Sequence, residues 1–388
     1  MPSNDDHGWL QTKTLKTRFG DFEFRGGYPV GDSVRRLLDQ LTFNRAVEVY
    51  LTQLMRVSAI GLRQGTKAFG AVTPQHLIIW EDLMDAKAVV LTANAETVYG
   101  IAHLDLKADG PTVVEAAPKM LGFMHDALQR YVVDIGPLGP DKGEGGKYLV
   151  VPPGYDGPTP EGYFLARSPT YSVFLAVRGF QVDGSTAPAV ALMNQTRIYA
   201  LADADNPPPM QFLSGSHQPI DTLFPDTDRY FDLLAMLVDE EPAELFDPVE
   251  RFQMQAVGIV KGQPFAPDDS ARALLGEAAR AGGAMARAIT YGPPAAYFYP
   301  DRRWQSAALE LGHTFERDGI PQIDARNTVY YMGAGNSPAM MDKNVGRGSQ
   351  YLWTFRDASG EFLDGARTYR LHIPAGIPCD ELLVGRGL

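Results

Sequence analysis

Residues 97–116 read TVYGIAHLDLKADGPTVVEA, and this stretch predicts two short β-strands separated by a turn. Apolar and β-branched residues dominate both ends, and the Asp-Gly-Pro cluster between them is typical of a turn. Similar runs continue from Ala88 to about Leu213, among them AVVLT, RYVVDI, KYLVVP, YFLARS and SVFLAVRGF. Many short strands, with a turn about every ten residues, predict an antiparallel β-sandwich.

Helical patterns flank this β-rich stretch. Residues 33–64 carry apolar side chains at helical spacing without an intervening proline, and predict one packing helix or a pair. Residues 227–240, 243–258 and 268–290 predict further helices. After residue 292 the runs YFYPD, TVYYM, YLWTF and YRLHI alternate with turn clusters and predict strands again. The predicted fold class is therefore mainly β with an α-helical insert.

The length of 388 residues exceeds that of an ordinary single domain. We expect an N-terminal arm with packing helices at 1–70, a β-sandwich domain at 71–225, a small helical domain at 226–292 and a second β domain at 293–388.

The composition narrows the class of protein. A net charge of −12 argues against nucleic-acid binding, because phosphate recognition needs clustered Lys and Arg. No apolar run is long enough to span a bilayer, so no membrane insertion is expected. The single cysteine excludes an internal disulfide and a cysteine-built metal site. The N-terminal residues lack the apolar block of a secretory signal, so a cytoplasmic location is expected, with a small-molecule ligand or a protein as partner.

The sequence lacks the GxSxG, P-loop, HExxH and CxxC signatures, and GEGGK at 143–147 fits an ordinary turn. The sharpest local pattern is HLD, because His103 and Asp105 would share one face of a strand. With a distant third histidine (His125, His217, His313 or His372) such a pair could bind iron or manganese. The alternative is an ordinary histidine near the end of a strand.

Two further polar clusters stand out. HDALQRYVVD at 125–134, taken as one strand, would place Arg130, Val132 and Asp134 on one face, with Asp126 aligned if the strand begins that early. An Arg–Asp pair there could be a structural ion pair or a clamp for an anionic ligand. LTANAETVYG at 91–100 could form either a turn with side-chain-to-backbone hydrogen bonds or the polar rim of a pocket.

Long motifs give the chain a resemblance that covers it from about Phe22 onward. EDLMDAK at 81–87, LTANAETVYG, GPLGPDKGEGGKYLVVPPGY at 136–155 and ADNPPPM at 204–210 resemble the bacterial domain of unknown function DUF1254. The stretches 325–340 and 346–374 resemble its usual C-terminal companion, DUF1214. The resemblance implies an immunoglobulin-like sandwich, a small helical domain and a jelly-roll, and no accepted reaction.

Several candidate site residues fall on motifs of the resembled family, whereas His103 departs from its pattern, which weakens the metal hypothesis. No metal site is therefore expected, and the sequence names no cofactor. The residues that match are Asn94, Thr97, Tyr99, Asp126, Arg130, Asp134, Lys142, Lys147 and Arg167.

The tail departs from the resembled family. Relatives continue with a segment similar to DFWSVVVYD, whereas this chain has DELLVGRGL. Residues 382–388 can be encoded so that reading one base later restores FWSVVV, so we expect a frameshift and an incomplete jelly-roll. Without its closing strands such a domain would be loose or poorly soluble.

The sequence leaves two functions open. The first is an enzyme acting on a small organic molecule, in which Asp126 or Asp134 is the base and Arg130 holds a carboxylate or stabilises developing negative charge. Asn94, Thr97, Tyr99, Lys142, Lys147 and Arg167 would then bind the ligand. The alternative is a non-catalytic β-sandwich that binds a ligand or forms an oligomer, and a homo-oligomer is expected in either case.

Overall fold

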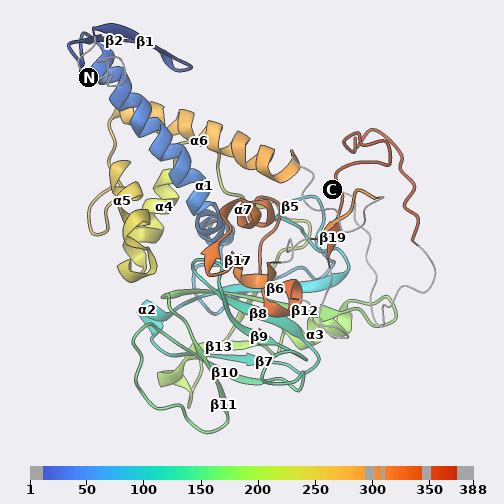
Figure 1. Ribbon diagram of the computed structural model, residues 1–388. Helices are drawn as coiled ribbons and strands as arrows, with labels where there is room; N and C mark the ends of the chain where they lie inside the picture. The colour runs from blue at the N-terminus through green and yellow to red at the C-terminus, as the bar shows by residue number, and fades with distance from the viewer. Residues whose placement is uncertain (1–11, 293–301, 307–310, 343–350, 374–388) are drawn as a thin grey trace. The chain divides into compact units, whose positions relative to one another are not determined.

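The structure is a computed structural model that describes four stretches of the chain (Figure 1): residues 12–292, 302–306, 311–342 and 351–373. The chain forms two compact units, of which the first comprises Met1–Val57 and Pro225–Ala286 and the second comprises Ser58–Phe224 and Arg287–Leu388. The boundary at Val57 falls inside the long helix α1 (Ser33–Phe69). The four domains expected from the sequence remain a prediction.

The first unit contains a three-stranded antiparallel meander and is otherwise helical. Its elements are β1 (Lys13–Thr17), β2 (Gly20–Arg25), β3 (Tyr28–Pro29), the first part of α1, α4 (Arg229–Glu240), the 3-10 helix η4 (Ala243–Leu245), α5 (Pro248–Ala256) and most of α6 (Asp269–Tyr291). The four predicted helical stretches are confirmed, with 243–258 divided into η4 and α5. None of the helices in the described part of the chain has both the length and the apolar character needed to cross a bilayer.

Aromatic contacts and caps fix these helices. The rings of Tyr50 and Tyr230 stack at 4.1 Å, and the Tyr230 hydroxyl donates to the backbone oxygen of Tyr50 at 2.7 Å. Gly282 of α6 allows this approach, since a Cβ there would lie 2.7 Å from the Tyr50 ring. Asp247 and Glu250 form a capping box at the start of α5.

Two β-sheets dominate the second unit. The six-stranded sheet has the order β14 (Gln211–Ser214), β4 (His76–Ile79), β6 (Thr97–Asp105), β12 (Ser172–Phe180), β8 (Leu121–Asp126) and β9 (Tyr131–Ile135). The four-stranded sheet has the order β11 (Tyr163–Arg167), β10 (Gly146–Val151), β7 (Thr112–Ala116) and β13 (Arg197–Ala200). All neighbours are antiparallel except β14–β4 and β10–β11, which are parallel.

Short elements complete the described part of this unit. Three two-stranded pairs are β5 (Ala88–Val89) with β15 (Ile220–Asp221), β16 (Gln305–Ser306) with β19 (Leu352–Trp353), and β17 (Glu316–Arg317) with β18 (Ile320–Pro321). The helices are α2 (Leu106–Asp109), α3 (Ala187–Met193), α7 (Ile323–Met332), α8 (Pro338–Met341) and the 3-10 turns η3 (Leu201–Asp203) and η5 (Gly312–Thr314).

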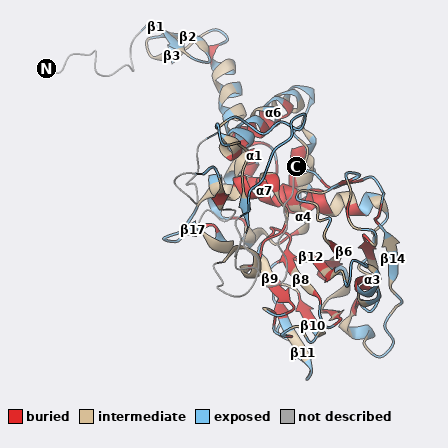
Figure 2. Cartoon of the chain, turned by 90° about the vertical axis from the view of Figure 1, so that its right-hand side faces the viewer, coloured by how far each residue is buried: buried red, intermediate tan, exposed pale blue. Residues whose placement is uncertain are grey.

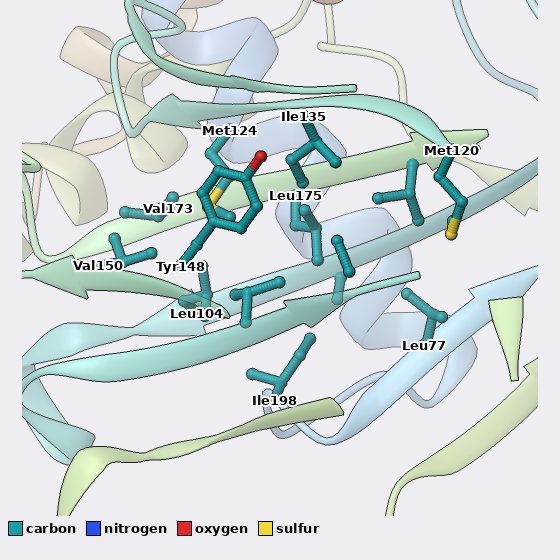
Figure 3. Packing of buried hydrophobic residues seen from close by; sticks show 14 of the residues in the cluster. Leu77, Leu104, Met120, Met124, Ile135, Tyr148, Val150, Val173, Leu175 and Ile198 are labelled. Carbon is teal, nitrogen blue, oxygen red and sulfur yellow. The ribbon is translucent and has the colours of Figure 1, made fainter. Parts of the chain in front are cut away.

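One face of each sheet contributes to a single hydrophobic core. Figure 3 shows Leu104, Met124 and Leu175 from the six-stranded sheet beside Tyr148 and Ile198 from the four-stranded sheet. These side chains are fully or almost fully buried, and Figure 2 shows the central strands as mostly buried. Antiparallel, mainly β architecture in this part of the chain agrees with the prediction from short alternating runs.

Alternation along the central strand β12 separates this core from a second face. Val173, Leu175 and Val177 point into the core between the sheets. Phe174 and Ala176 pack into a different cluster, which also contains the fully buried Trp80. We call this second side of the six-stranded sheet the outer face, and it carries most of the polar residues considered below.

The structure does not confirm most of the C-terminal strands predicted from the sequence. The TVYYM run lies in helix α7, so the strand predicted there is wrong. Buried contacts of Val329 and Tyr330 outweigh the β preference of these residues. YLWTF retains only the short β19, and YRLHI at 369–373 forms no strand. The jelly-roll is not confirmed, and the YFYPD run and the tail after residue 373 lie outside the described residues.

Candidate functional site

Residues 121–135 form a β-hairpin, so the single strand predicted for 125–134 is wrong. Strand β8 ends at Asp126, and Gln129 turns the chain with a φ of +56°. One Asp126 carboxylate oxygen accepts the backbone N–H groups of Leu128 and Arg130, both at 2.8 Å. The other accepts Nε of Arg130 at 2.7 Å. Burial raises the pKa of Asp126 and the Arg130 charge partly offsets the rise, so this pair has the geometry of a turn-forming ion pair.

A β-bulge in this hairpin decides which side chains share a face. His125 pairs with Tyr131, whereas the preceding pair is Met124 with Val133, so one extra residue is inserted in β9. Val132 and Val133 therefore both pack toward the core between the sheets. Asp134 pairs with Phe123 and Tyr131 pairs with His125, so Asp134 and Tyr131 share the outer face. The predicted grouping of Arg130, Val132 and Asp134 on one face is therefore wrong.

Strand register aligns the outer face in three rows. Residues directly opposite one another on neighbouring strands lie on the same face of a sheet. The rows are Tyr99–Arg178–Leu121, Ile101–Ala176–Phe123–Asp134 and His103–Phe174–His125–Tyr131. Aromatic contacts support this arrangement, since Phe123 stacks on His125 at 4.3 Å and His103 lies 5.2 Å from the Phe174 ring.

The GAGNSP segment at 333–338 lies over one end of these rows. Nε2 of His125 contacts both the backbone N–H and the backbone oxygen of Asn336. The N–H of Gly335 donates to the side chain of Gln129 at 3.2 Å. Gly335 has a φ of +97°, and a Cβ there would lie 2.9 Å from Phe123, so glycine permits the close approach.

Asp134 is the most perturbed carboxylate of this region that lacks a direct ion pair in the described structure. Only 4% of its surface is exposed, and burial raises its pKa to about 6. Ser337, the Ala339 N–H and the charge of His313 favour the ionised form and limit the rise, whereas Asp342 adds to it.

His313 and Tyr131 extend this polar group. Nδ1 of His313 lies 2.9 Å from both carboxylate oxygens of Asp342, which orients the ring. The Tyr131 ring lies 5.8 Å from the His313 ring, and its hydroxyl accepts the Asp134 N–H at 3.2 Å. Burial and then the Asp134 charge raise the pKa of Tyr131. We call Asp134, Tyr131, His313 and Asp342 the acid–base cluster.

Sequence reasoning found only part of this cluster. Asp134 was predicted, whereas His313 was considered only as a metal ligand and Tyr131, Ser337 and Asp342 were missed. The available signal was the GAGNSPAM motif at 333–340, whose small and polar residues lie just before Asp342.

The HLD pattern has a structural explanation. One oxygen of Asp105 accepts the N–H groups of Lys107 and Ala108, both at 3.1 Å, and caps α2. His103 is held neutral, because burial lowers its pKa to about 3. No group of three or more His, Cys, Asp or Glu in the described ranges is placed to hold a metal ion.

The three predicted ligand-binding residues of the TAN segment lie in different surroundings. Asn94 forms a turn, because its side-chain oxygen accepts the N–H groups of Glu96 at 2.8 Å and Thr97 at 3.0 Å. Thr97 is buried at the start of β6. Tyr99 lies on the outer face, in the same row as Arg178.

The remaining predicted ligand-binding residues belong to the four-stranded sheet and its loops. Lys142 is exposed in the loop before β10, with a φ of +52°. Lys147 pairs with Glu115 at 3.2 Å, and Arg167 donates to the backbone oxygen of Tyr155 at 3.1 Å. The structure does not bring these three residues into the acid–base cluster.

Comparisons with known proteins agree with part of the resemblance. The crystal structure of the VPA0106 protein from Vibrio parahaemolyticus is similar, with a TM-score of 0.50 and 15% identity over 76% of this chain and 68% of that one, which indicates a shared fold. An uncharacterized protein from Burkholderia cenocepacia matches with a TM-score of 0.24 and 16% identity over 46% of this chain and 53% of that one. The search of curated proteins found no match. Residues 74–200, which include the hairpin with Asp134, match the family described as "Protein of unknown function (DUF1254)".

Proposed function

We propose that this protein is an enzyme that transfers protons on a small organic molecule, with Asp134 as the general base. The observation that carries this proposal is the buried Asp134 carboxylate, whose pKa is raised to about 6 beside His313 and Tyr131. A carboxylate with a pKa near neutrality is ionised at physiological pH and still basic enough to remove a proton.

His313 has the features of the second proton-transfer group. Its ring is oriented by Asp342, and an imidazole held by a carboxylate is a common acid–base arrangement. Tyr131 has a raised pKa and would act as a hydrogen-bond donor that stays protonated. These groups suit removal of a proton from carbon or water and its return to a neighbouring atom.

The structure favours Asp134 over Asp126 for the base. Asp126 already accepts three hydrogen bonds within its own turn, one of them from the Arg130 side chain. Arg130 is therefore engaged at Nε, although 45% of its side chain is exposed. In this proposal the Asp126–Arg130 pair shapes the hairpin that presents Asp134.

Hydrogen exchange tests this function even though the natural substrate and product are unidentified. The native protein would be incubated in D2O with a panel of small keto and hydroxy acids, and deuterium incorporation at carbon would be followed by NMR. We expect the Asp134→Asn variant to lose about 10²- to 10⁴-fold in exchange rate, and the native rate to rise with pH through about 6. Exchange that persists unchanged in Asp134→Asn would rule out Asp134 as the base.

The alternative, a non-catalytic ligand-binding module, makes a different prediction. Such a protein would be stabilised by a compound of the panel without exchanging or converting it.

We further propose that the two sheets form the immunoglobulin-like sandwich implied by DUF1254. The DUF1214 jelly-roll, a homo-oligomer and a cytoplasmic location remain predictions.

A further inference from the structure

Arg178 is a charged residue on the outer face of the six-stranded sheet. Its neighbours in the strand register are Tyr99 of β6 and Leu121 of β8. On its own strand, the next residue on the same face is Ala176, which is buried. The side chain is itself only partly exposed.

Within the described ranges, no carboxylate forms an ion pair with Arg178. Its polar neighbours are the hydroxyls of Tyr99 and Tyr351. Burial alone would lower the pKa of the guanidinium, whereas Tyr99 and Tyr351 raise it, and an arginine side chain stays charged at neutral pH in either case. A desolvated charge without a counter-charge is costly, and an anionic ligand would offset that cost.

We propose that Arg178, Tyr99 and Tyr351 form a binding site for the carboxylate group of an apolar organic acid. Arginine presents parallel N–H donors that match the two oxygens of a carboxylate, and tyrosine hydroxyls can add further donors. The flanking residues Leu121 and Phe123 favour an apolar body next to the charged group.

The site also extends the proposed function, on which this step rests. Arg178 lies two strands and two residues away from Asp134 in the register, which places their Cα atoms about 12 Å apart. With the reach of both side chains, a small acid anchored at Arg178 could present its reactive carbon toward Asp134. Arg178 then takes the anchoring role that the sequence suggested for Arg130.

The test measures binding of sodium benzoate to the full-length protein by calorimetry and thermal shift, with benzamide as the neutral control at equal ionic strength. We expect saturable binding of benzoate and none of benzamide. Arg178→Met should weaken benzoate binding by about 10- to 100-fold, and Tyr99→Phe and Tyr351→Phe by smaller factors. The matched control Arg197→Gln, on β13 of the other sheet, should bind as the native protein does.

Stability separates a binding role from a structural one. Without ligand, Arg178→Met should melt at the native temperature or above it, because it removes a desolvated charge for which the described residues supply no counter-charge. A large fall in melting temperature would indicate a structural arginine and overturn the proposal. If Arg178→Met fails to fold, the two tyrosine variants decide the matter, because they keep the rings and remove only the hydroxyls.

The remaining outcomes are equally decisive. Equal binding of benzoate and benzamide, no benzoate binding, or preferred binding of inorganic phosphate would overturn the carboxylate site. Asp134→Asn should retain benzoate binding. Intact benzoate binding together with hydrogen exchange that does not depend on Asp134 would refute the proposed base and keep the anion site. Exchange that depends on Asp134 together with a lack of benzoate binding would refute the anion site alone.

Discussion

Replacement of Asp134 by asparagine should stabilise the protein at neutral pH while removing the proposed base. The pKa of this carboxyl rises from 3.8 to about 6 in the folded protein, because burial penalises its charge. The folded state therefore binds the proton more tightly than the unfolded chain does. Stability is fully present below about pH 4 and falls as the pH rises through 6.

The shift sets the size of the effect. A change from 3.8 to about 6 corresponds to about 3 kcal/mol of unfolding free energy lost at high pH. Asparagine has the shape of the protonated acid and carries no charge. Asp134→Asn should therefore be up to about 3 kcal/mol more stable than the native protein at pH 8, and nearly equal to it below pH 4.

Asp126→Asn is the matched control, because it changes a second buried aspartate of the same hairpin. Its carboxylate accepts Nε of Arg130, and an amide nitrogen in that position could not. Burial raises the pKa of Asp126 too, so removal of its charge relieves a desolvation cost, but the loss of the Arg130 hydrogen bond offsets this gain. We therefore expect Asp126→Asn to gain less stability at pH 8 than Asp134→Asn does. Urea unfolding followed by tryptophan fluorescence, to which the fully buried Trp80 contributes, measures both variants across the pH range.

A specific result would refute this reasoning. If Asp134→Asn is less stable than the native protein at pH 8, then the ionised Asp134 is stabilised by the fold and is not held in an unfavourable environment. A difference between native and variant that does not change with pH would lead to the same conclusion. In either case Asp134 would be a structural residue, and the proposed base would have to be abandoned.

Three further predictions concern other parts of the chain. Burial lowers the pKa of His103 from 6.5 to about 3, so its contribution to stability is lost as the pH falls below 6.5. His103→Leu should therefore reduce the acid-induced loss of stability by about 2 kcal/mol between pH 6.5 and 4.5, as measured by thermal melts at both values. The Arg56–Glu250 pair at 2.6 Å is largely buried in the first unit, so Arg56→Met should cost about 3–5 kcal/mol, and the double change with Glu250→Leu should recover most of it in urea unfolding. The Lys261 ammonium donates to the backbone carbonyls of Val238, Asp239 and Glu241 at the end of α4. Lys261→Met should therefore lower the unfolding free energy by about 1–2 kcal/mol, and an unchanged melting curve would show that this cap is dispensable.

The predictable part of this fold is the part that local periodicity specifies. The helices of the first unit and most strands of the two sheets follow from apolar spacing, turn residues and the absence of proline, whereas β4 and the β1–β3 meander were not predicted. TVYYM at 328–332 shows the limit of such reasoning, because its β-branched and aromatic residues read as a strand in isolation. In α7 the same residues bury Val329 and Tyr330 on a helix, and tertiary packing prevails over propensity.

The candidate site depends on two structural features that the alternation of apolar and polar residues along a strand does not predict. The first is the bulge in β9, which places Tyr131 and Asp134 on one face although their spacing is odd; the adjacent Val132 and Val133 were the only local sign of it. The second is the approach of the segment at 313–342 to a hairpin that lies about half the chain away in sequence. Asn336 reaches His125 across 211 residues, and no local pattern encodes such a contact. A side chain whose pKa is set by burial and by partners from the distant segment, as that of Asp134 is, could therefore be proposed from sequence but could be given a chemical role only from the structure.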